Sequence, residues 1–307
     1  MITTVCMNPS FDKTASIQRL ETGGVNRIGD VRVDIGGKGL NVAIVLKRLG
    51  VAVRCVGCLG EDNADAFLRM IQKENVVFDH LLVPGEVRTN LKLMEEENKV
   101  ITEFNEQGIS LNAQQTEAFI QLLKKYSFES EYVVLSGRLP AGCSPETYRH
   151  CIQAVSGKKC ILDADGEALL HGIKEKPYLI KPNLPEMEAI MKRELRTLRS
   201  LRDAALFMID YGAQNVVISM GKYGAMFVNK ETTLFAPALM VEARSTVGAG
   251  DAMVGGILSG LSKGEELRDA FRYGVAAGAA SVMTDGTQLV RKNDFESLLS
   301  KVTVQEV

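Results

Sequence analysis

The chain has 307 residues, a formal net charge of −2 and 24% charged residues. This balance disfavours nucleic acid or a membrane surface as a partner, because either would require an excess of basic residues. No apolar run approaches the ~18 residues that a membrane span requires, and the first residues, Met1 to Cys6, lack the charged-then-apolar plan of a signal peptide. We therefore expect a cytoplasmic protein with neither kind of partner.

Strand-like apolar segments alternate with amphipathic helices along the chain. Strands are expected at Ile2–Met7, Val53–Leu59, Val77–Leu82, Tyr132–Ser136, Lys159–Asp163, Tyr178–Lys181 and Asn215–Ser219. Helices are expected at Val42–Leu49, Asp62–Glu74, Ala113–Lys125, Pro145–Ala154, Leu198–Tyr211, Ala252–Leu261 and Leu267–Met283. This alternation predicts an α/β fold with a mostly parallel central sheet flanked by helices. Ligands bind such sheets beyond the carboxyl ends of the strands.

Two stretches break the alternation, at about residues 14–35 and 88–105. Both contain strand-like segments of mixed polarity with no helix between them, and Lys92–Thr102 indicates a hairpin with its turn near Glu97 and Asn98. We expect these stretches to form a small β-sheet lid over the ligand cleft.

The six cysteines do not suggest a disulfide scaffold in a chain of this length. Cys55 and Cys58 lie within an apolar strand pattern, and neither a second cysteine pair nor a histidine follows at metal spacing. We expect buried thiols there.

Two glycine-rich turns precede helices and are suited to bind anions. The first is Gly36–Asn41, and the second is Ser245–Asp251. The first N–H groups of a helix have no internal partner, so they and the helix dipole attract negative charge. Asp251 stands at the rim of the second turn, where a carboxylate can accept a proton from an attacking hydroxyl. The alternative is that Gly250 or Asp251 only caps the helix.

Neither turn matches a P-loop or a complete dinucleotide-binding pattern. Two separate anion-ready turns suggest two polar ligands in one cleft, one carrying a triphosphate and the other a sugar. A nicotinamide-dependent oxidoreductase is disfavoured because its glycine fingerprint is missing.

Seven segments in order resemble the ribokinase-like, PfkB-type carbohydrate kinases, and above all the phosphosugar branch of that family. They are Asn8–Asp12, Gly36–Ala43, Gly85–Lys92, Ser136–Pro140, Lys181–Glu186, Ser219–Ala225 and Val247–Asp251. The resemblance spans essentially the whole chain. It implies a single ribokinase-like domain over residues 1–307 and a homodimer that pairs through the lid, with Arg27 reaching the partner's site.

The resemblance also assigns roles to polar residues. It implies that the substrate is bound by Asp12, Gly36, Gly37, Lys38, Asn41, Arg88, Asn90 and Arg138. It implies that ATP is bound by Lys181, Asn183, Ser219, Gly221, Gly224, Thr246, Gly248 and Gly250. Mg²⁺ would be held, through water, by Glu186 and Asn183. Asp251 would be the general base, with the turn of Gly248, Ala249 and Gly250 stabilising the transferred phosphoryl group. Adenine would lie near 275–281.

Each assignment has a structural alternative. Asp12 could cap a turn, the two arginines could be solvated surface residues, and Glu186 could be a first-turn partner of the helix dipole. The loop that contains Gly221 and Gly224 could be an ordinary hairpin turn.

The resulting hypothesis is ATP-dependent phosphorylation of a ketohexose phosphate. Fructose 1-phosphate, converted to fructose 1,6-bisphosphate, is the expected acceptor, because the segments 88–93 and 100–105 resemble the lid of 1-phosphofructokinases. Tagatose 6-phosphate and fructose 6-phosphate remain alternatives, and so does a non-catalytic regulator that binds sugar phosphates. Relatives that use a monovalent cation carry Asp where this chain has Ser245, six residues before Asp251, which puts potassium activation in doubt.

Overall fold

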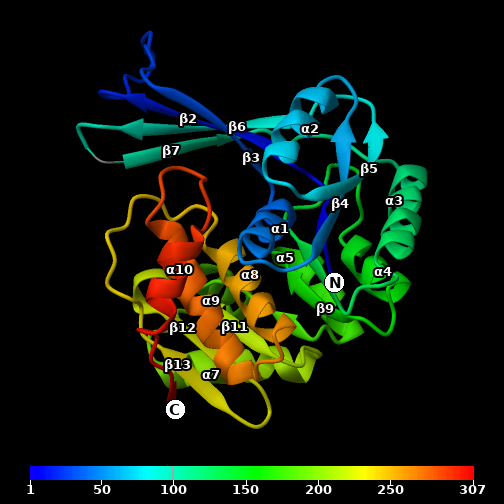
Figure 1. The fold of residues 1–307 in the computed structure, drawn as a ribbon, viewed down its shortest axis with the longest axis vertical. Helices are drawn as coiled ribbons and strands as arrows, with labels where there is room; N and C mark the ends of the chain where they lie inside the picture. Colours follow the sequence, from blue (N-terminus) through cyan, green and yellow to red (C-terminus); the bar gives the residue numbers. More distant parts are fainter. Residues whose placement is uncertain (99) are drawn as a thin grey trace.

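The computed structural model describes residues 1–98 and 100–307. Lys99, which falls within the predicted lid, lies outside the described residues. The described chain forms a ten-stranded sheet flanked by helices and a separate four-stranded sheet (Figure 1). The α/β architecture and the additional small sheet are those predicted from the sequence.

The strands of the large sheet follow the order β14-β13-β12-β11-β10-β9-β8-β1-β4-β5. Their bounds are β1 Ile2–Cys6, β4 Val53–Gly60, β5 Val77–Val83, β8 Tyr132–Ser136, β9 Lys159–Asp163, β10 Leu179–Ile180, β11 Val216–Ser219, β12 Ala225–Val228, β13 Thr233–Ala236 and β14 Gln305–Glu306. Neighbours from β5 to β11 pair in parallel, whereas β11 to β14 pair antiparallel. The parallel part confirms the prediction.

Helices cover both faces of the large sheet. Their bounds are α1 Lys38–Arg48, α2 Ala64–Lys73, α3 Ala113–Tyr126, α4 Thr147–Ala154, α5 Gly166–Gly172, α6 Leu184–Met191, α7 Leu198–Tyr211, α8 Ala249–Ser262, α9 Leu267–Val282 and α10 Lys292–Leu299, with short 3₁₀ turns at Ile173–Glu175 and Gly221–Tyr223. One core lies under α1, α2, α8, α9 and α10, and the other under α3 to α7. Cys55 belongs to the first core and Cys58 to the second, and both are free, buried thiols.

Two helices begin earlier than the sequence pattern predicts. α1 begins at Lys38 and α8 at Ala249, so each glycine turn supplies the first helical turn itself. The residues at the two N-caps are Gly37, with φ of 119°, and Gly248, with φ of 78°. Only glycine adopts such conformations readily. Neither Gly250 nor Asp251 caps α8, so that alternative is wrong.

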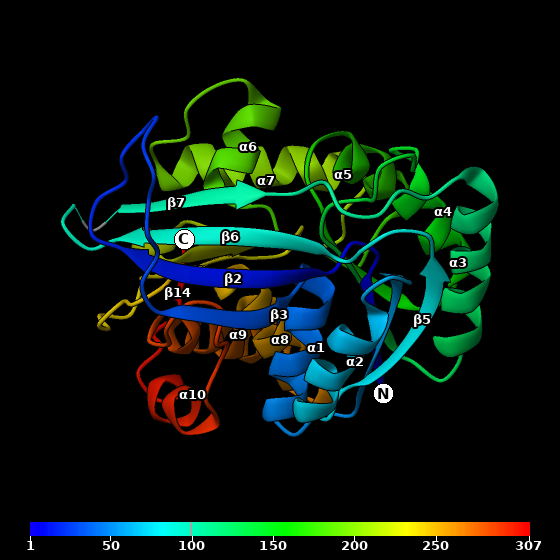
Figure 2. The ribbon, with the colours of Figure 1, turned by 90° about the horizontal axis from the view of Figure 1, so that it is seen from above.

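The four-stranded sheet has the order β3-β2-β6-β7, with β2 Ser10–Ile17, β3 Val31–Gly36, β6 Arg88–Glu95 and β7 Val100–Asn105. Its strands lie side by side across one end of the molecule (Figure 2). The predicted hairpin is present as the antiparallel pair β6–β7. The first lid segment differs from the prediction, because β2 already begins at Ser10 and most of residues 18–30 are irregular. Asp12 therefore lies inside a strand and caps no turn.

Among the described residues, no helix has the length and apolar character needed to cross a membrane.

Candidate active site

A cavity of about 1050 Å³ lies between the carboxyl edge of the large sheet and the four-stranded sheet. It is lined by most of the residues singled out in the sequence: Asp12, Gly37, Lys38, Asn41, Arg88, Asn90, Arg138, Lys181, Asn183, Ser219, Gly221, Gly224, Thr246, Gly248, Ala249, Gly250 and Asp251. Gly36, Glu186 and Arg27 are not part of this lining. The fold thus brings both glycine turns to one cavity.

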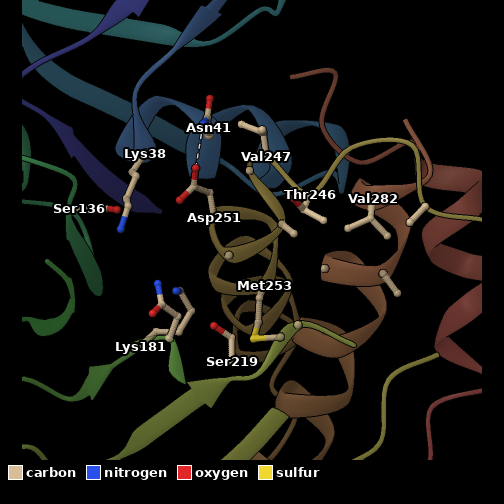
Figure 3. Close-up of a pocket in the computed structure, with 18 of the residues that line it drawn as sticks. Lys38, Asn41, Ser136, Lys181, Ser219, Thr246, Val247, Asp251, Met253 and Val282 are labelled. Atoms are coloured by element: carbon tan, nitrogen blue, oxygen red, sulfur yellow. Dashed lines mark hydrogen bonds between the residues drawn. The ribbon is translucent and has the colours of Figure 1, made fainter. Parts of the chain in front are cut away.

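Asp251 lies at the centre of the cavity wall, on the first turn of α8 (Figure 3). Only 6% of its surface is exposed, and its Oδ2 accepts a hydrogen bond from Asn41 Nδ2 at 2.8 Å. Burial raises the pKa of Asp251 to about 6, and the nearby charge of Asp163 adds to this effect. Asp251 is therefore an ionised but poorly solvated carboxylate at neutral pH, as a general base requires.

The backbone beside Asp251 offers unpaired hydrogen-bond donors. Among the described residues, no protein acceptor is recorded for the N–H groups of Gly248, Gly250 and Asp251, whereas Ala249 N–H donates to the Thr246 carbonyl at 3.4 Å. These donors point from the positive end of α8, so this turn can bind a phosphoryl group.

Two lysines converge on a buried carboxylate close to this turn. Asp163 Oδ1 lies 3.2 Å from Lys38 Nζ, and Asp163 Oδ2 lies 3.5 Å from Lys181 Nζ. Burial of Asp163 favours its neutral form, but Lys181 and Lys38 outweigh that effect and hold its pKa below the ordinary carboxyl value. Asp163 in turn raises the pKa of Lys38. A Cβ on Gly250 would lie 3.1 Å from Lys181 Nζ, so this ammonium group adjoins the start of α8.

Sequence reasoning missed Asp163. It is the last residue of β9, an apolar strand of the parallel sheet. An acidic residue at the carboxyl end of a buried strand was a usable signal.

Asp12 lies on β2 with three donors around its carboxylate. Ser10 Oγ and Asn90 Nδ2 donate to Oδ1 at 2.8 and 2.9 Å, and Lys92 Nζ lies 3.0 Å from Oδ2. Gly36 packs against this group, because a Cβ there would come within 2.7 Å of the carboxylate. The role of Gly36 is thus to leave space for Asp12. Lys92 lines the cavity but was absent from the predicted site.

Arg88 and Arg138 line the same end of the cavity. Arg88 donates hydrogen bonds to the carbonyls of Glu106 and Asn8. Burial lowers the pKa of the Arg88 guanidinium, and the positive charge of the neighbouring Arg138 contributes to this decrease. Within residues 1–98 and 100–307, neither arginine forms an ion pair with a carboxylate. Two such cations in a cavity are suited to bind a phosphate group.

Asn183 and Glu186 form a reciprocal capping box at the start of α6. Asn183 N–H donates to Glu186 Oε2, and Glu186 N–H donates to Asn183 Oδ1, both at 2.9 Å. In the described part of the chain, no three acidic, histidine or cysteine side chains converge on one point as metal ligands. A Mg²⁺ ion here would therefore be bound mainly by phosphate and water oxygens, as Mg²⁺ commonly is.

The far end of the cavity is apolar. The predicted segment 275–281 contributes Val275, Gly278 and Ala279, but the 3₁₀ turn and the segment 238–241 also contribute to this lining. Tyr223 and Met240 are 62% and 99% exposed at its mouth. Sequence reasoning missed the segment 238–241, because no motif marks it, whereas the 3₁₀ turn lies within the Ser219–Ala225 motif. Gly221 and Gly224 do belong to a turn between antiparallel strands, β11 and β12, and they line the cavity as well.

An α/β fold with a buried carboxylate, clustered cations and helix-start amides that are unpaired among the described residues is suited to phosphoryl transfer. The family model described as "pfkB family carbohydrate kinase" matches residues 6–293. This chain belongs to the pfkB family of carbohydrate kinases and is a phosphotransferase.

Curated relatives agree with this classification. A 1-phosphofructokinase of Vibrio cholerae is 34% identical, with 99% of this chain and 96% of that protein covered. A 1-phosphofructokinase of Escherichia coli is 33% identical, with 99% and 98% covered.

Solved structures show the same fold. Phosphofructokinase-2 from Escherichia coli, in complex with substrates and products, has a TM-score of 0.91, 30% identity and 98% coverage of both chains. A tetrameric inhibited form of the same enzyme has a TM-score of 0.89, also at 30% identity and 98% coverage of both chains.

Proposed function

We propose that this kinase transfers the γ-phosphoryl group of ATP to a primary hydroxyl of a ketohexose phosphate, with fructose 1-phosphate as the preferred acceptor. The observation that carries the proposal is the distribution of charge in the cavity. The buried carboxylate of Asp251 lies at the centre, two arginines that have no carboxylate partner among the described residues lie at one end, and the other end is apolar. A sugar phosphate and a nucleotide would thus meet at Asp251.

The chemistry follows from these positions. Asp251 accepts the proton of the attacking hydroxyl, while Asn41 keeps its carboxylate oriented. The free amides of Gly248 and Gly250 stabilise negative charge on the transferred phosphoryl oxygens. Lys38 and Lys181, held by Asp163, add positive charge close to this turn. The four-stranded sheet acts as a lid that excludes water, which would otherwise compete as the acceptor.

Mg²⁺ is the proposed metal. When bound with the nucleotide, it neutralises phosphate charge and orients the phosphates for transfer. Glu186 would contact the Mg²⁺ ion through water. The Oε2 atom of Glu186 is occupied by the capping box, and Glu186 lies outside the cavity lining. Asn183, which lines the cavity, would contribute with Lys181 and Ser219 to binding the nucleotide phosphates.

The choice of fructose 1-phosphate rests on the lid segments of β6 and β7 and on the curated relatives, which are named 1-phosphofructokinase. Tagatose 6-phosphate and fructose 6-phosphate carry the same anion, so the arginines alone do not select among them. Asn90 and Asn105 line the cavity from paired positions on β6 and β7. A single unmatched buried hydrogen bond costs ~1–3 kcal/mol, which is about 5- to 150-fold in discrimination.

We also propose a homodimer through the lid. Val33, Leu91 and Phe104 share one row with Lys13 on the sheet face opposite Asp12, and Val33 and Phe104 are 43% and 52% exposed. A second copy would cover this apolar face. Arg27, exposed in the irregular segment after β2, would then reach the partner's cavity.

The deciding experiment measures kcat/KM for the three ketohexose phosphates with identical MgATP. We expect the highest value for fructose 1-phosphate. A higher value for either 6-phosphate would refute the substrate and leave the kinase mechanism intact. Tight binding without any ADP release would instead favour the non-catalytic regulator.

A further inference from the structure

Lys92 is a buried lysine to which the proposed reaction gives no role. Only 5% of its surface is exposed, although it lies on β6 at the wall of the cavity. Its ammonium lies 3.0 Å from Asp12 Oδ2, and both side chains of the pair are 6% exposed. Burying two charges is expensive and is rarely justified by stability alone, so the pair calls for a functional explanation.

The ammonium group has more donors than the protein uses. Lysine offers three N–H donors, and within the described residues only the bond to Asp12 is recorded for Lys92. Two buried acceptors beside it are also unused, because Asn90 Oδ1 and Thr14 Oγ1 have no hydrogen-bond partner in the part of the chain that the structure describes. In the register of the sheet, Asn90 pairs with Asp12 and Thr14 pairs with Lys92, so these groups share one face. An unmatched polar cluster of this kind is complementary to a polyhydroxylated ligand.

The charge pattern separates this cluster from the phosphate end. The charge of Lys92 is already neutralised by Asp12, whereas Arg88 and Arg138 have no carboxylate partner in the described chain. A phosphate dianion is attracted to the uncompensated arginines. Two neutral hydroxyl groups of a sugar instead suit the Asp12–Lys92 ion pair, in which the carboxylate accepts a hydrogen bond and the ammonium donates one.

We propose that Lys92 is a specificity-determining residue that, paired with Asp12, binds hydroxyl oxygens of the sugar ring and so orients the acceptor between Arg88/Arg138 and Asp251. This inference rests on the proposed function, because it assumes that a sugar phosphate occupies the cavity. It assigns the phosphate to the arginines, the ring hydroxyls to the lysine–carboxylate couple and the reacting hydroxyl to Asp251.

The test compares Lys92→Met with Lys124→Met as the control. Lys124 is an exposed lysine on α3, lies outside the cavity lining and is not part of the four-stranded sheet. Each variant is assayed with whichever ketohexose phosphate the wild-type enzyme uses best, so a different preferred sugar would refute the proposed substrate without affecting this test. We expect kcat/KM for the sugar to fall about 10- to 150-fold in Lys92→Met, with the larger share in KM. The KM for ATP of Lys92→Met and all kinetic parameters of Lys124→Met should remain within about threefold of wild type.

Monodeoxy analogues of that sugar phosphate, lacking one ring hydroxyl at a time, distinguish direct contact from a structural role. For one analogue, we expect kcat/KM with the wild-type enzyme to be lower than for the parent sugar phosphate. For that same analogue, Lys92→Met should show no lower kcat/KM than the wild-type enzyme does. Equal losses for every analogue, or a sugar kcat/KM within threefold of wild type, would overturn the proposal.

Removing Lys92 alone leaves the buried charge of Asp12 uncompensated and could prevent folding. The double variant Asp12→Asn/Lys92→Met replaces the pair by neutral groups of similar shape and keeps the test available. It should fold and bind ATP, and it should lose discrimination against the same deoxy analogue. Retention of wild-type discrimination in the folded double variant would contradict the assignment.

Discussion

Asn41 Nδ2 donates a 2.8 Å hydrogen bond to Asp251 Oδ2, although the two residues are 210 positions apart in the sequence. The bond joins the first turn of α1 to the first turn of α8, so each of the two glycine turns contributes one member of the pair. It fixes the orientation of the proposed base and favours its ionised form. This single contact connects the proposed sugar side of the cavity with the proposed phosphoryl-transfer side.

Asp251→Asn should lower kcat by ~10²–10⁴, the usual contribution of a general base, with little change in ATP affinity. The fold should persist, because asparagine has the same shape. Steady-state kinetics and nucleotide titration measure both effects. A variant that retains more than a tenth of the wild-type kcat would show that Asp251 is not the base.

The same variant should be more stable than wild type at neutral pH. The pKa of Asp251 is raised in the folded state, so its contribution to stability is lost as pH rises from the unfolded-state pKa through about 6. Removing the buried charge should therefore raise the free energy of unfolding at pH 8 by up to roughly 3 kcal/mol. Urea unfolding at pH 8 and pH 4 measures this, and the gain should vanish at pH 4. An equal gain at both values would contradict it.

The acid limb of the pH–rate profile should report the protonation of the Asp251 carboxylate. Wild-type kcat/KM should fall as pH drops below about 6, because the carboxylate becomes protonated. Asp163→Asn should move this limb to lower pH, because it removes a nearby negative charge. Asn41→Ala should move it to higher pH, because it removes a hydrogen bond to the ionised form. Shifts in the same direction for both variants would refute this electrostatic description.

Arg88→Ala and Arg138→Ala should each weaken use of the sugar phosphate by ~1.5–3 kcal/mol, the range for charged hydrogen bonds. Binding of ATP should barely change. The comparison is made between a ketohexose phosphate and its unphosphorylated parent. Equal losses on both acceptors would exclude the arginines as phosphate ligands.

The Glu186→Gln variant separates the negative charge of Glu186 from its role in the capping box of α6. Glutamine preserves a capping box, so stability should be unchanged, while the Mg²⁺ concentration for half-maximal rate should rise. Glu186→Ala is the matched comparison and should also destabilise the fold by about 0.5–2 kcal/mol. A Mg²⁺ titration of Glu186→Gln that superimposes on wild type would leave Glu186 with the capping role alone.

Phe104→Lys tests the proposed dimer, because it places a charge on the exposed apolar face of the lid. We expect light scattering to show a dimeric wild-type protein and a monomeric variant. A monomeric wild type would refute the proposal.

Local sequence pattern was sufficient for much of the fold. Continuous apolar strands alternating with helices predicted the parallel sheet. The strands of a parallel sheet are buried on both faces, so successive residues along each strand are apolar. The turns at Gly36–Asn41 and Val247–Asp251 were visible, because helix-start chemistry depends on adjacent residues. The helix starts themselves were placed too late, since the glycines that adopt positive φ are also the N-caps.

Tertiary structure alone decided which charges meet. Asp163 lies between Lys38 and Lys181 because β9 and the two lysine-bearing segments converge at one sheet edge. Lys92 reaches Asp12 because β2 and β6 pair in parallel with a particular register. Interactions between residues far apart in sequence depend on strand order and register, which the local apolar pattern does not encode. The sequence therefore determined the elements and the two glycine turns at the helix starts, and the tertiary structure determined their electrostatic partners.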